Sequence, residues 1–239
     1  MANPTAAMLV IGDEILSGRT RDSNMHYLAN ELTRHGIRLS EVRVVPDVTE
    51  AIVAATNALR QTHDHLFTSG GIGPTHDDIT ADAIAQAFGV RIGHRADAMA
   101  LLQAHYDRAG QDFNAARQRM ARIPDGATLI DNPVSTAPGF TLGNVHVMAG
   151  VPKIFEAMVA SVMPRLTGGD PLLSQSLRVN RGEGEIAEPF GALAAEFPDL
   201  SMGSYPFILN GAHGTNLVVR GTDAARIDAA MIRLAALFG

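Results

Sequence analysis

The 239-residue sequence contains no cysteine, no tryptophan and a single lysine, and each scarcity removes a class of function. Without cysteine the chain has no disulfide framework, no thiolate zinc site and no cysteine nucleophile. Lys153 follows Pro152 and precedes Ile154, which excludes the Gly-Lys-Ser/Thr signature of a Walker phosphate loop. The nine histidines show no His-x-x-x-His spacing, so a zinc site is not expected.

Basic charge and long apolar runs are also scarce. Nineteen Lys plus Arg stand against 25 Asp plus Glu, a net charge of −6, and the few aromatic residues offer no stacking surface, so no nucleic-acid partner is expected. No run approaches the ~18 apolar residues of a membrane span, so no membrane partner is expected. The first apolar stretch, residues 6–11, ends in Gly-Asp-Glu rather than in a cleavage site. We therefore expect a cytoplasmic protein.

Strand and helix patterns alternate along the first two thirds of the chain. Apolar strands at 6–11, 37–45 and 65–68 are followed by helix patterns beginning near 24, 50 and 81, with an Asp47 and Glu50 capping box and with Asp78 or Thr80 as a further helix cap. This alternation predicts a mostly parallel sheet with helices on both faces. Further on, the pattern predicts helices within 95–121, a strand at 128–130, a hairpin of 140–142 and 145–148 around Gly143-Asn144, and a helix at 154–166. The sheet is therefore expected to be mixed.

The segment Thr167-Gly-Gly-Asp-Pro171 is the one convincing linker, and it divides the chain into domains 1–167 and 172–239. After it, strand patterns near 176–179, 201–209 and 216–219 and two helix patterns give the order βαββα. The expected fold class is α/β, a three-layer α/β/α domain followed by a small α+β domain.

The most informative stretch runs from Ser69 to Thr80, between the third strand and its helix. Its three glycines allow backbone N–H groups to approach an anion, and the following helix adds positive partial charge, so phosphate or pyrophosphate is the natural ligand. His76 stands where a dinucleotide fingerprint needs a third glycine. It is either an acid–base group or a surface loop residue, and we favour the surface interpretation. The competing interpretation is a tight turn with Asp78 as helix cap. The substrate-binding candidates here are Ser69, Gly70, Gly71, Gly73 and Thr75.

Acidic and polar residues at the same predicted sheet edge are the remaining candidates. Asp77 and Asp78 suit a hard divalent cation held together with phosphate oxygens. The loop after the first strand adds Asp13 and Glu14, which are either ligands or residues of a solvated turn. The turn 149–152 either holds a further anion or starts a helix. The other substrate-binding candidates are Asn24 and, from the loop 132–139, Ser135, Thr136 and Gly139.

Five ordered motifs produce a family resemblance that covers about residues 6–166. They are Gly12-Asp-Glu-Ile-Leu16, Asp22-Ser-Asn24, Val45-Pro-Asp47, Gly70-Gly-x-Gly-Pro-Thr-x-Asp-Asp-x-Thr80, and Asn132-Pro to Ala137-Pro-Gly139. Together they resemble the molybdopterin-binding domain superfamily of molybdenum-cofactor biosynthesis, and most closely the N-terminal domain of the competence/damage-inducible protein A family. The stretches 203–206 and 217–223 are similar to that family's smaller following domain.

The resemblance implies a three-layer fold, a homo-oligomer (dimer or trimer) and two kinds of activity. One is hydrolysis of an ADP-ribose- or FAD-like diphosphate that depends on Mg²⁺, Mn²⁺ or Co²⁺; the other is binding or adenylylation of molybdopterin. By the same resemblance, Asp78 is the metal-binding or catalytic acid and Asp13 a second acid. With the acids already named, the catalytic candidates are Asp78, Asp77 and Asp13, and the candidate metal ligands are Asp78, Asp77 and Glu14. We expect a nucleotide pyrophosphatase. The alternatives are a molybdopterin-binding protein or adenylyltransferase, and a nucleotide-binding domain without catalysis.

Overall fold

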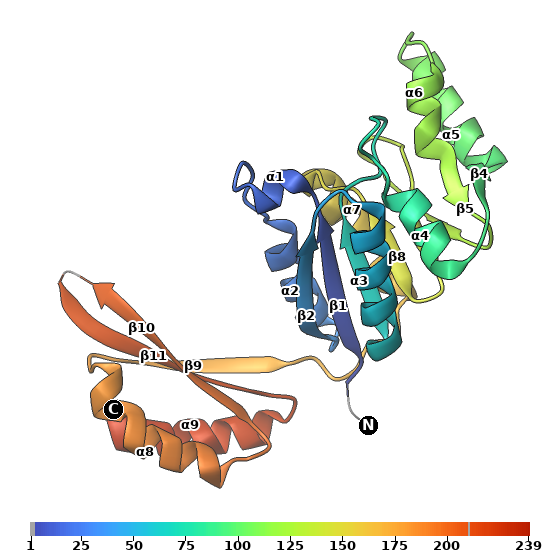
Figure 1. Cartoon of the computed structure of the whole chain (residues 1–239). Coiled ribbons are helices and arrows are strands. Elements are labelled where there is room, and N and C mark those ends of the chain that lie inside the picture. Colours follow the sequence, from blue (N-terminus) through green and yellow to red (C-terminus); the bar gives the residue numbers. More distant parts are fainter. Residues whose placement is uncertain (1–2, 210) are drawn as a thin grey trace. The chain divides into compact units, whose positions relative to one another are not determined.

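The first apolar run of the chain forms β1 (Thr5–Ile11), an interior strand of a six-stranded sheet (Figure 1). In the computed structural model, which describes residues 3–209 and 211–239, its side chains alternate between two cores. Ala7, Leu9 and Ile11 enter one core, and Ala6, Met8 and Val10 enter the other. A strand buried on both faces has no polar alternation, which is why it appears in the sequence as a continuous apolar run.

The sheet is mixed, as predicted. Its strands follow the order β2-β1-β3-β8-β7-β6. The first four are parallel, whereas β7 pairs antiparallel with both of its neighbours. The other strands of the sheet are β2 (Arg38–Val45), β3 (His65–Ser69), β6 (Thr128–Ile130), β7 (Gly139–Leu142) and β8 (Val145–Met148). β6 is antiparallel to β7, and β7 is antiparallel to β8, so β6 runs in the same direction as β8. It therefore ends at the same sheet edge as β1, β3 and β8.

Helices cover both faces of the sheet, which confirms the three-layer α/β/α class (Figure 1). α3 (Thr49–Thr62) and α4 (Thr80–Phe88) pack on the face of Leu9. α2 (Asn24–Arg34) and α7 (Pro152–Val162) pack on the opposite face. The expected helix 154–166 thus begins two residues earlier, and its last turn is the separate 3₁₀ turn η2 (Met163–Arg165).

Three local predictions were wrong. The stretch 12–18 is not only a loop, because it contains the one-turn helix α1 (Asp13–Leu16). Asp47 forms no capping box; its carboxylate accepts a hydrogen bond from the Asp13 N–H, and Val48 precedes α3 without a side-chain cap. Neither Asp78 nor Thr80 caps α4, since Ile79 is its N-cap residue and Thr80 its first residue. In the last two cases the polar side chains hydrogen-bond to groups outside the helix instead of capping it.

The segment after α4 forms a small lobe with a strand pair that the sequence did not predict. β4 (Ile92–His94) pairs antiparallel with β5 (Arg122–Pro124). Between them in the chain lie α5 (Ala96–Arg108), α6 (Ala115–Gln118) and the 3₁₀ turn η1 (Arg119–Ala121). This pairing brings η1 back to the main domain.

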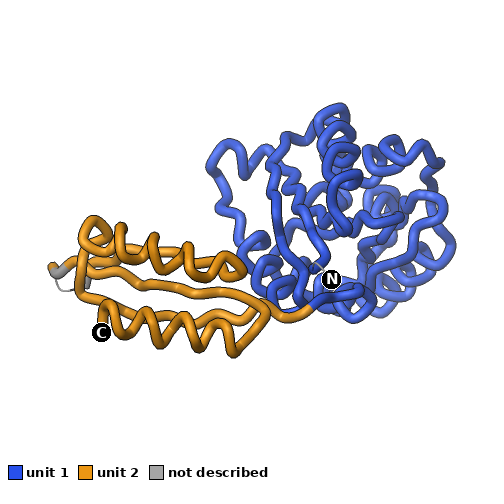
Figure 2. Tube along the Cα trace, turned by 90° about the horizontal axis from the view of Figure 1, so that it is seen from below, with its two compact units in different colours: residues 1–169 blue, residues 170–239 orange. Residues whose placement is uncertain are grey.

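The chain divides into two compact units, residues 1–169 and 170–239 (Figure 2). The second unit has the predicted βαββα order and a core of its own. Its three antiparallel strands follow the order β10-β11-β9. Across the described residues, no helix has both the length and the apolar composition that a membrane crossing needs. The elements of this unit are β9 (Leu173–Val179), α8 (Glu183–Glu196), β10 (Ser201–Leu209), β11 (Ala212–Gly221) and α9 (Ala224–Phe238).

Candidate functional site

Five strands end at the same edge of the six-stranded sheet, and the loops after four of them, β1, β3, β6 and β8, lie together at the candidate site. Backbone hydrogen bonds tie them to neighbouring strands: the Gly12 N–H donates to the Val45 carbonyl, and the Gly70 N–H donates to the Met148 carbonyl. Ligands of open α/β sheets bind at the carboxyl edge of the strands. The loops therefore meet where the fold favours a binding site.

A cleft of about 510 Å³ opens between these loops. Its volume lies in the range of ~300–1,000 Å³ typical of small-molecule and cofactor sites. The site candidates in its wall are Glu14, Gly70, Gly71, Gly73, Asp78 and Ser135. The wall also contains Thr20, Ile72, Pro74, Met120, Asn132, Ala137, Ala149, Gly150, Val151, Pro152, Ile154 and Met158.

The glycine loop after β3 takes a shape that side chains would block. Gly70 and Gly71 have φ values of +109° and +69°, in the left-handed region that favours glycine. A Cβ on Gly70 would overlap the Ile11 carbonyl oxygen, and one on Gly71 would overlap the Thr80 hydroxyl. That hydroxyl donates to the Gly70 carbonyl at 3.0 Å, and the Thr80 N–H donates to the Gly71 carbonyl at 3.0 Å. The start of α4 thereby fixes the loop.

Part of the loop's main chain remains available to a ligand. The N–H groups of Gly70 and Thr75 are bound to protein acceptors, Met148 O and Asp78 Oδ2. Within the described part of the chain, the N–H groups of Gly71, Ile72 and Gly73 have no such acceptor. Consecutive free N–H groups at a glycine turn form an anion-binding concavity. These three amides are the donors the structure leaves for an anion.

Asp78 is held against the glycine loop. A Cβ on Gly73 would lie 2.6 Å from Asp78 Oδ2, so only glycine allows the carboxylate to lie there. Oδ2 accepts hydrogen bonds from the Thr75 N–H (2.8 Å) and the Thr75 hydroxyl (2.7 Å). Oδ1 accepts none from the described residues. One carboxylate oxygen thus fixes the loop, while the other is left for a ligand.

Asp77 and His76 lie outside the wall of the cleft. The Asp77 side chain is 63% exposed, and the His76 side chain is 99% exposed. The single hydroxyl proton of Thr75 is shared between the carboxylates of Asp78 and Asp77, and the interaction with Asp77 lowers the pKa of the Asp77 carboxyl below its usual value. The surface interpretation of His76 agrees with this exposure.

The acids of the first loop surround Asp47. The Asp13 N–H donates to Asp47 Oδ2 at 2.9 Å, and Asp13 does not line the cleft, whereas Glu14 does. Burial raises the pKa of the Asp47 carboxyl, and the negative charges of Asp13, Glu14 and Asp77 raise it further, against the opposing effect of the Asp13 N–H bond. This rim of the cleft therefore concentrates negative charge.

Asn24 and Ser69 belong to a smaller cavity of about 60 Å³ that shares Glu14 and Gly150 with the main cleft. Asn24 is 3% exposed, and its Nδ2 donates to Ser69 Oγ and Gly150 O, both at 2.8 Å. Its Oδ1 is buried without a partner among the described residues. These bonds tie α2 to the last residue of β3 and to the loop after β8.

The loop 132–138 contributes Ser135 but not the other two candidates from this region. Asn132 is 2% exposed, and its Nδ2 bonds to Ser135 Oγ and the Ala137 carbonyl, which holds the loop. Thr136 has φ +66°, and its hydroxyl contacts His105 Nδ1 at 3.0 Å, away from the cleft wall. Gly139 is buried in β7, where a Cβ would overlap the Val147 carbonyl.

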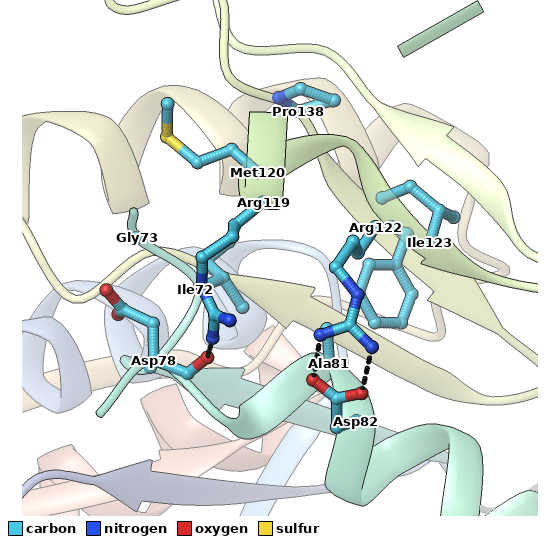
Figure 3. Close-up of a pocket in the computed structure, with 12 residues that line it drawn as sticks. Ile72, Gly73, Asp78, Ala81, Asp82, Arg119, Met120, Arg122, Ile123 and Pro138 are labelled. Atoms are coloured by element: carbon cyan, nitrogen blue, oxygen red, sulfur yellow. Dashed lines mark hydrogen bonds and ion pairs between the residues drawn. The ribbon is translucent and has the colours of Figure 1, made fainter. Parts of the chain in front are cut away.

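Sequence reasoning missed Arg119 and Met120, which reach the glycine loop from η1 (Figure 3). Met120 also lines the main cleft. Arg119 Nη2 donates to the Asp78 carbonyl at 3.3 Å across a separation of 41 residues. No local pattern marks these residues, because only the β4–β5 pairing brings η1 to the loop.

The protein supplies few ligands for a metal ion by itself. Among residues 3–209 and 211–239, no group of three or more His, Asp or Glu side chains is placed to hold a metal. Asp78 and Glu14 are the acids in the wall of the main cleft. An ion bound here would need ligands from elsewhere, such as the oxygens of a phosphate group.

The part of the chain that forms this cleft matches a known protein family. Residues 7–168 match a family model described as "Probable molybdopterin binding domain". The chain belongs to this molybdopterin-binding domain family. Residues 171–239 match a second model, "FAD synthase, middle domain". The family resemblance predicted from the five motifs is thus confirmed.

Individual relatives match different shares of this chain. A "CinA-like protein" of Citrifermentans bemidjiense is 38% identical over 167 residues, 68% of this chain and 40% of that protein. A "Probable FAD synthase" of Caenorhabditis briggsae is 29% identical over 255 residues, 96% of this chain and 49% of that protein. The chain therefore spans less than half the length of these two relatives.

A solved structure is also similar. It is the crystal structure of "the protein CinA with unknown function from Thermoplasma acidophilum", with 34% sequence identity and a TM-score of 0.63. The similarity covers 69% of this chain and 99% of that one. It agrees with the three-layer fold described above.

Proposed function

We propose that this chain is a divalent-metal-dependent nucleotide pyrophosphatase that acts on an ADP-ribose- or FAD-like diphosphate. The central observation is the juxtaposition of three free N–H groups, at Gly71, Ile72 and Gly73, with the Asp78 carboxylate. Donors and a carboxylate with one unused oxygen line the same cleft of about 510 Å³. A diphosphate with its counter-cation satisfies both.

The donor set fits a hard cation that is shared with the substrate. Mg²⁺ in phosphate sites usually binds one or two carboxylates and completes its shell with phosphate oxygens and water. Asp78 offers Oδ1, and Glu14 offers a carboxylate from the segment after β1 in the wall of the same cleft, so we assign these two residues to the ion. When bound, such an ion neutralises charge on the phosphoryl oxygens.

Hydrolysis would proceed by attack of water on one phosphorus of the diphosphate. The water oxygen forms the new P–O bond, the bridging P–O bond breaks, and the leaving phosphate takes the electron pair. With ADP-ribose the products are AMP and ribose 5-phosphate, and the protons of the water pass to solvent. The N–H groups of residues 71–73 donate to the non-bridging oxygens, over which the negative charge of the transition state is spread.

The C-terminal unit supports a nucleotide ligand. It matches the FAD synthase middle domain, and the C. briggsae relative named as an FAD synthase covers 96% of this chain. FAD and ADP-ribose share an adenosine diphosphate. We therefore favour an adenylate diphosphate over other diphosphates.

A second candidate is binding or adenylylation of molybdopterin. It is favoured by the match of residues 7–168 to the molybdopterin-binding family model. The phosphate of the pterin would occupy the same N–H groups. The two functions differ in product, because only the first releases AMP from a diphosphate that contains adenosine.

The decisive experiment compares the wild-type chain with Asp78→Asn in the presence of Mg²⁺, Mn²⁺ or Co²⁺, with ADP-ribose and FAD as substrates. The amide keeps an oxygen for Thr75 but removes the charge, and AMP release should fall by about 10²–10³, the cost of losing one charge-stabilising group. Asp107→Asn, on the exposed end of α5, is the matched control and should retain full activity.

Three results would overturn the hydrolase proposal. Equal AMP release by wild type and Asp78→Asn, unaffected by EDTA, would remove both Asp78 and the metal from the reaction. No AMP release by the wild type, with tight molybdopterin binding, would favour the second candidate. Binding of ADP-ribose without any product would instead indicate a nucleotide-binding domain.

A further inference from the structure

Arg119 approaches the glycine loop from a different part of the fold. It begins η1 and lines a small cavity together with Gly71, Gly73 and Asp78 (Figure 3). Its guanidinium is directed towards the main chain at Asp78, and Nη2 donates to the Asp78 carbonyl at 3.3 Å. This small cavity shares the glycine-loop residues 71–73 and Asp78 with the main cleft, so Arg119 lies directly behind the wall of the main cleft at these residues.

The Arg119 guanidinium has unused hydrogen-bonding capacity. Arginine carries five N–H donors, and Nε of Arg119 is buried without an acceptor among the described residues. Leaving a buried donor of a charged group unpaired costs stability, so such atoms usually mark a function or an absent partner. An acceptor that arrives with a ligand would remove this cost.

Arg119 differs from the neighbouring Arg122 in the groups that balance its charge. Arg122, its neighbour across the same small cavity, makes two hydrogen bonds to Asp82, at 2.6 and 2.8 Å, and its charge is thereby balanced (Figure 3). In the described structure Arg119 has no carboxylate partner. Acids also border the cleft, at Asp78 and Glu14 in its wall and around Asp47.

We propose that the Arg119 guanidinium is the cationic part of the diphosphate site and binds a phosphate oxygen together with the N–H groups of residues 71–73. This inference rests on the proposed function, since it assumes that a diphosphate occupies the cleft. A diphosphate needs positive charge in a site whose acids would otherwise repel it. Planar guanidinium groups bind phosphate oxygens through charge-assisted, oriented hydrogen bonds.

The test is calorimetric titration of the full chain and of Arg119→Met, which keeps an apolar stem of similar length, with ADP, inorganic pyrophosphate and adenosine. We expect affinity for ADP and pyrophosphate to fall by roughly 10- to 100-fold, the range for a hydrogen bond to a charged group, with adenosine affinity unchanged. Arg119→Lys should recover part of the loss as a point charge. Arg91→Met, whose side chain is 94% exposed, is the control and should bind like the wild type.

Salt dependence gives a readout that a structural role would not change. The wild-type affinity for pyrophosphate should decrease with ionic strength more steeply than that of Arg119→Met, because the variant has lost one cation from the site. The thermal unfolding midpoint of Arg119→Met should change little, since the removed Nε has no partner among the described residues and the Nη2 bond to the Asp78 carbonyl is long, at 3.3 Å.

The outcomes separate this inference from the proposed function. Unchanged ADP and pyrophosphate affinity in Arg119→Met, or an equal loss for adenosine, would overturn the role of Arg119 and leave the pyrophosphatase proposal intact. No binding of ADP or pyrophosphate by the wild type, with or without Mg²⁺, would overturn both.

Discussion

Gly71 shows at the scale of one residue how the loop geometry depends on a missing side chain. Its φ is +69°, and a Cβ would overlap the Thr80 hydroxyl that holds the Gly70 carbonyl. Gly89, at the end of α4, has φ +66°, and a Cβ added there would meet no described atom within 4 Å. The two glycines therefore share the backbone strain but not the steric clash.

Substitution of each glycine by alanine separates these effects. Gly89→Ala should cost about 1–2 kcal/mol of unfolding free energy, the usual penalty for an L-residue in the left-handed conformation. Gly71→Ala should cost more, because the Thr80 hydroxyl must also move, and it should weaken ADP binding. Urea unfolding and calorimetry measure the two quantities. Equal destabilisation by both changes, with unaltered ADP affinity, would show that the Gly70–Thr80 contact is not needed.

His146 is a buried titratable group that does not line the main cleft. It is 4% exposed, its Nδ1 lies 3.0 Å from the Thr141 hydroxyl, and its Nε2 lies 3.3 Å from His65 Nδ1. Burial lowers the pKa of His146 from 6.5 to about 3, and the neighbouring His65 contributes to this lowering. The unfolded state therefore binds a proton near pH 6.5 that the folded state binds only near pH 3.

The lowered pKa of His146 in the folded state makes folding stability depend on pH. As pH falls below 6.5, protonation of the unfolded state removes stability until about pH 3. His146→Asn lacks this titration, so the stability advantage of the wild type over the variant should shrink by about 2 kcal/mol between pH 7 and pH 5. The constant cost of the smaller side chain does not affect that change. Urea unfolding at both pH values tests it, and parallel curves would contradict it.

At the scale of elements, local signals were sufficient where the deciding contacts are local. Gly143-Asn144 predicted the β7–β8 hairpin, and Gly143 takes φ +57° there. The Asp47–Glu50 capping box failed because Asp47 bonds to the Asp13 N–H, which lies 34 residues away. The β4–β5 pair was missed for the same reason, since its three-residue strands are stabilised by a distant partner.

The same distinction between local and distant contacts explains which residues of the candidate site could be predicted. Gly70, Gly71, Gly73 and Asp78 could be predicted because one short motif after a strand contains both the turn and its acid. Arg119 could not be predicted, since its place beside Asp78 depends on the β4–β5 pairing. Sequence spacing also did not distinguish Asp77, which is exposed, from Asp78, which lines the cleft.

The cap of α9 tests a local signal in the second unit. Asp223 Oδ1 accepts hydrogen bonds from the N–H groups of Ala225 and Arg226, at 2.9 and 3.2 Å. Asp223→Ala should destabilise the unit by about 1 kcal/mol, whereas Asp223→Asn should retain most of the stability. Chemical unfolding followed by circular dichroism measures the difference. Equal stability of the alanine and asparagine variants would show that this cap contributes nothing.

At the scale of the whole molecule, the hydrophobic cores are separate. The two cores of residues 1–169 draw their buried members from between Ala6 and Met163, and the core of residues 170–239 draws its members from between Val179 and Phe238. Every residue that lines the main cleft lies between Glu14 and Met158. The first unit thus contains both the complete cleft wall and the cores that support it.

This separation predicts that a fragment of residues 1–169 folds alone and binds ADP with the affinity of the full chain. A unit of this size buries enough apolar surface for independent stability, whereas residues 170–239 lie near the size where single cores become marginal. Calorimetry with ADP and urea unfolding of the fragment test the two parts of the prediction. A fragment that unfolds cooperatively but has lost ADP affinity would mean that residues 170–239 contribute to the ligand site. A fragment without a cooperative transition would mean that the two units stabilise each other despite their separate cores.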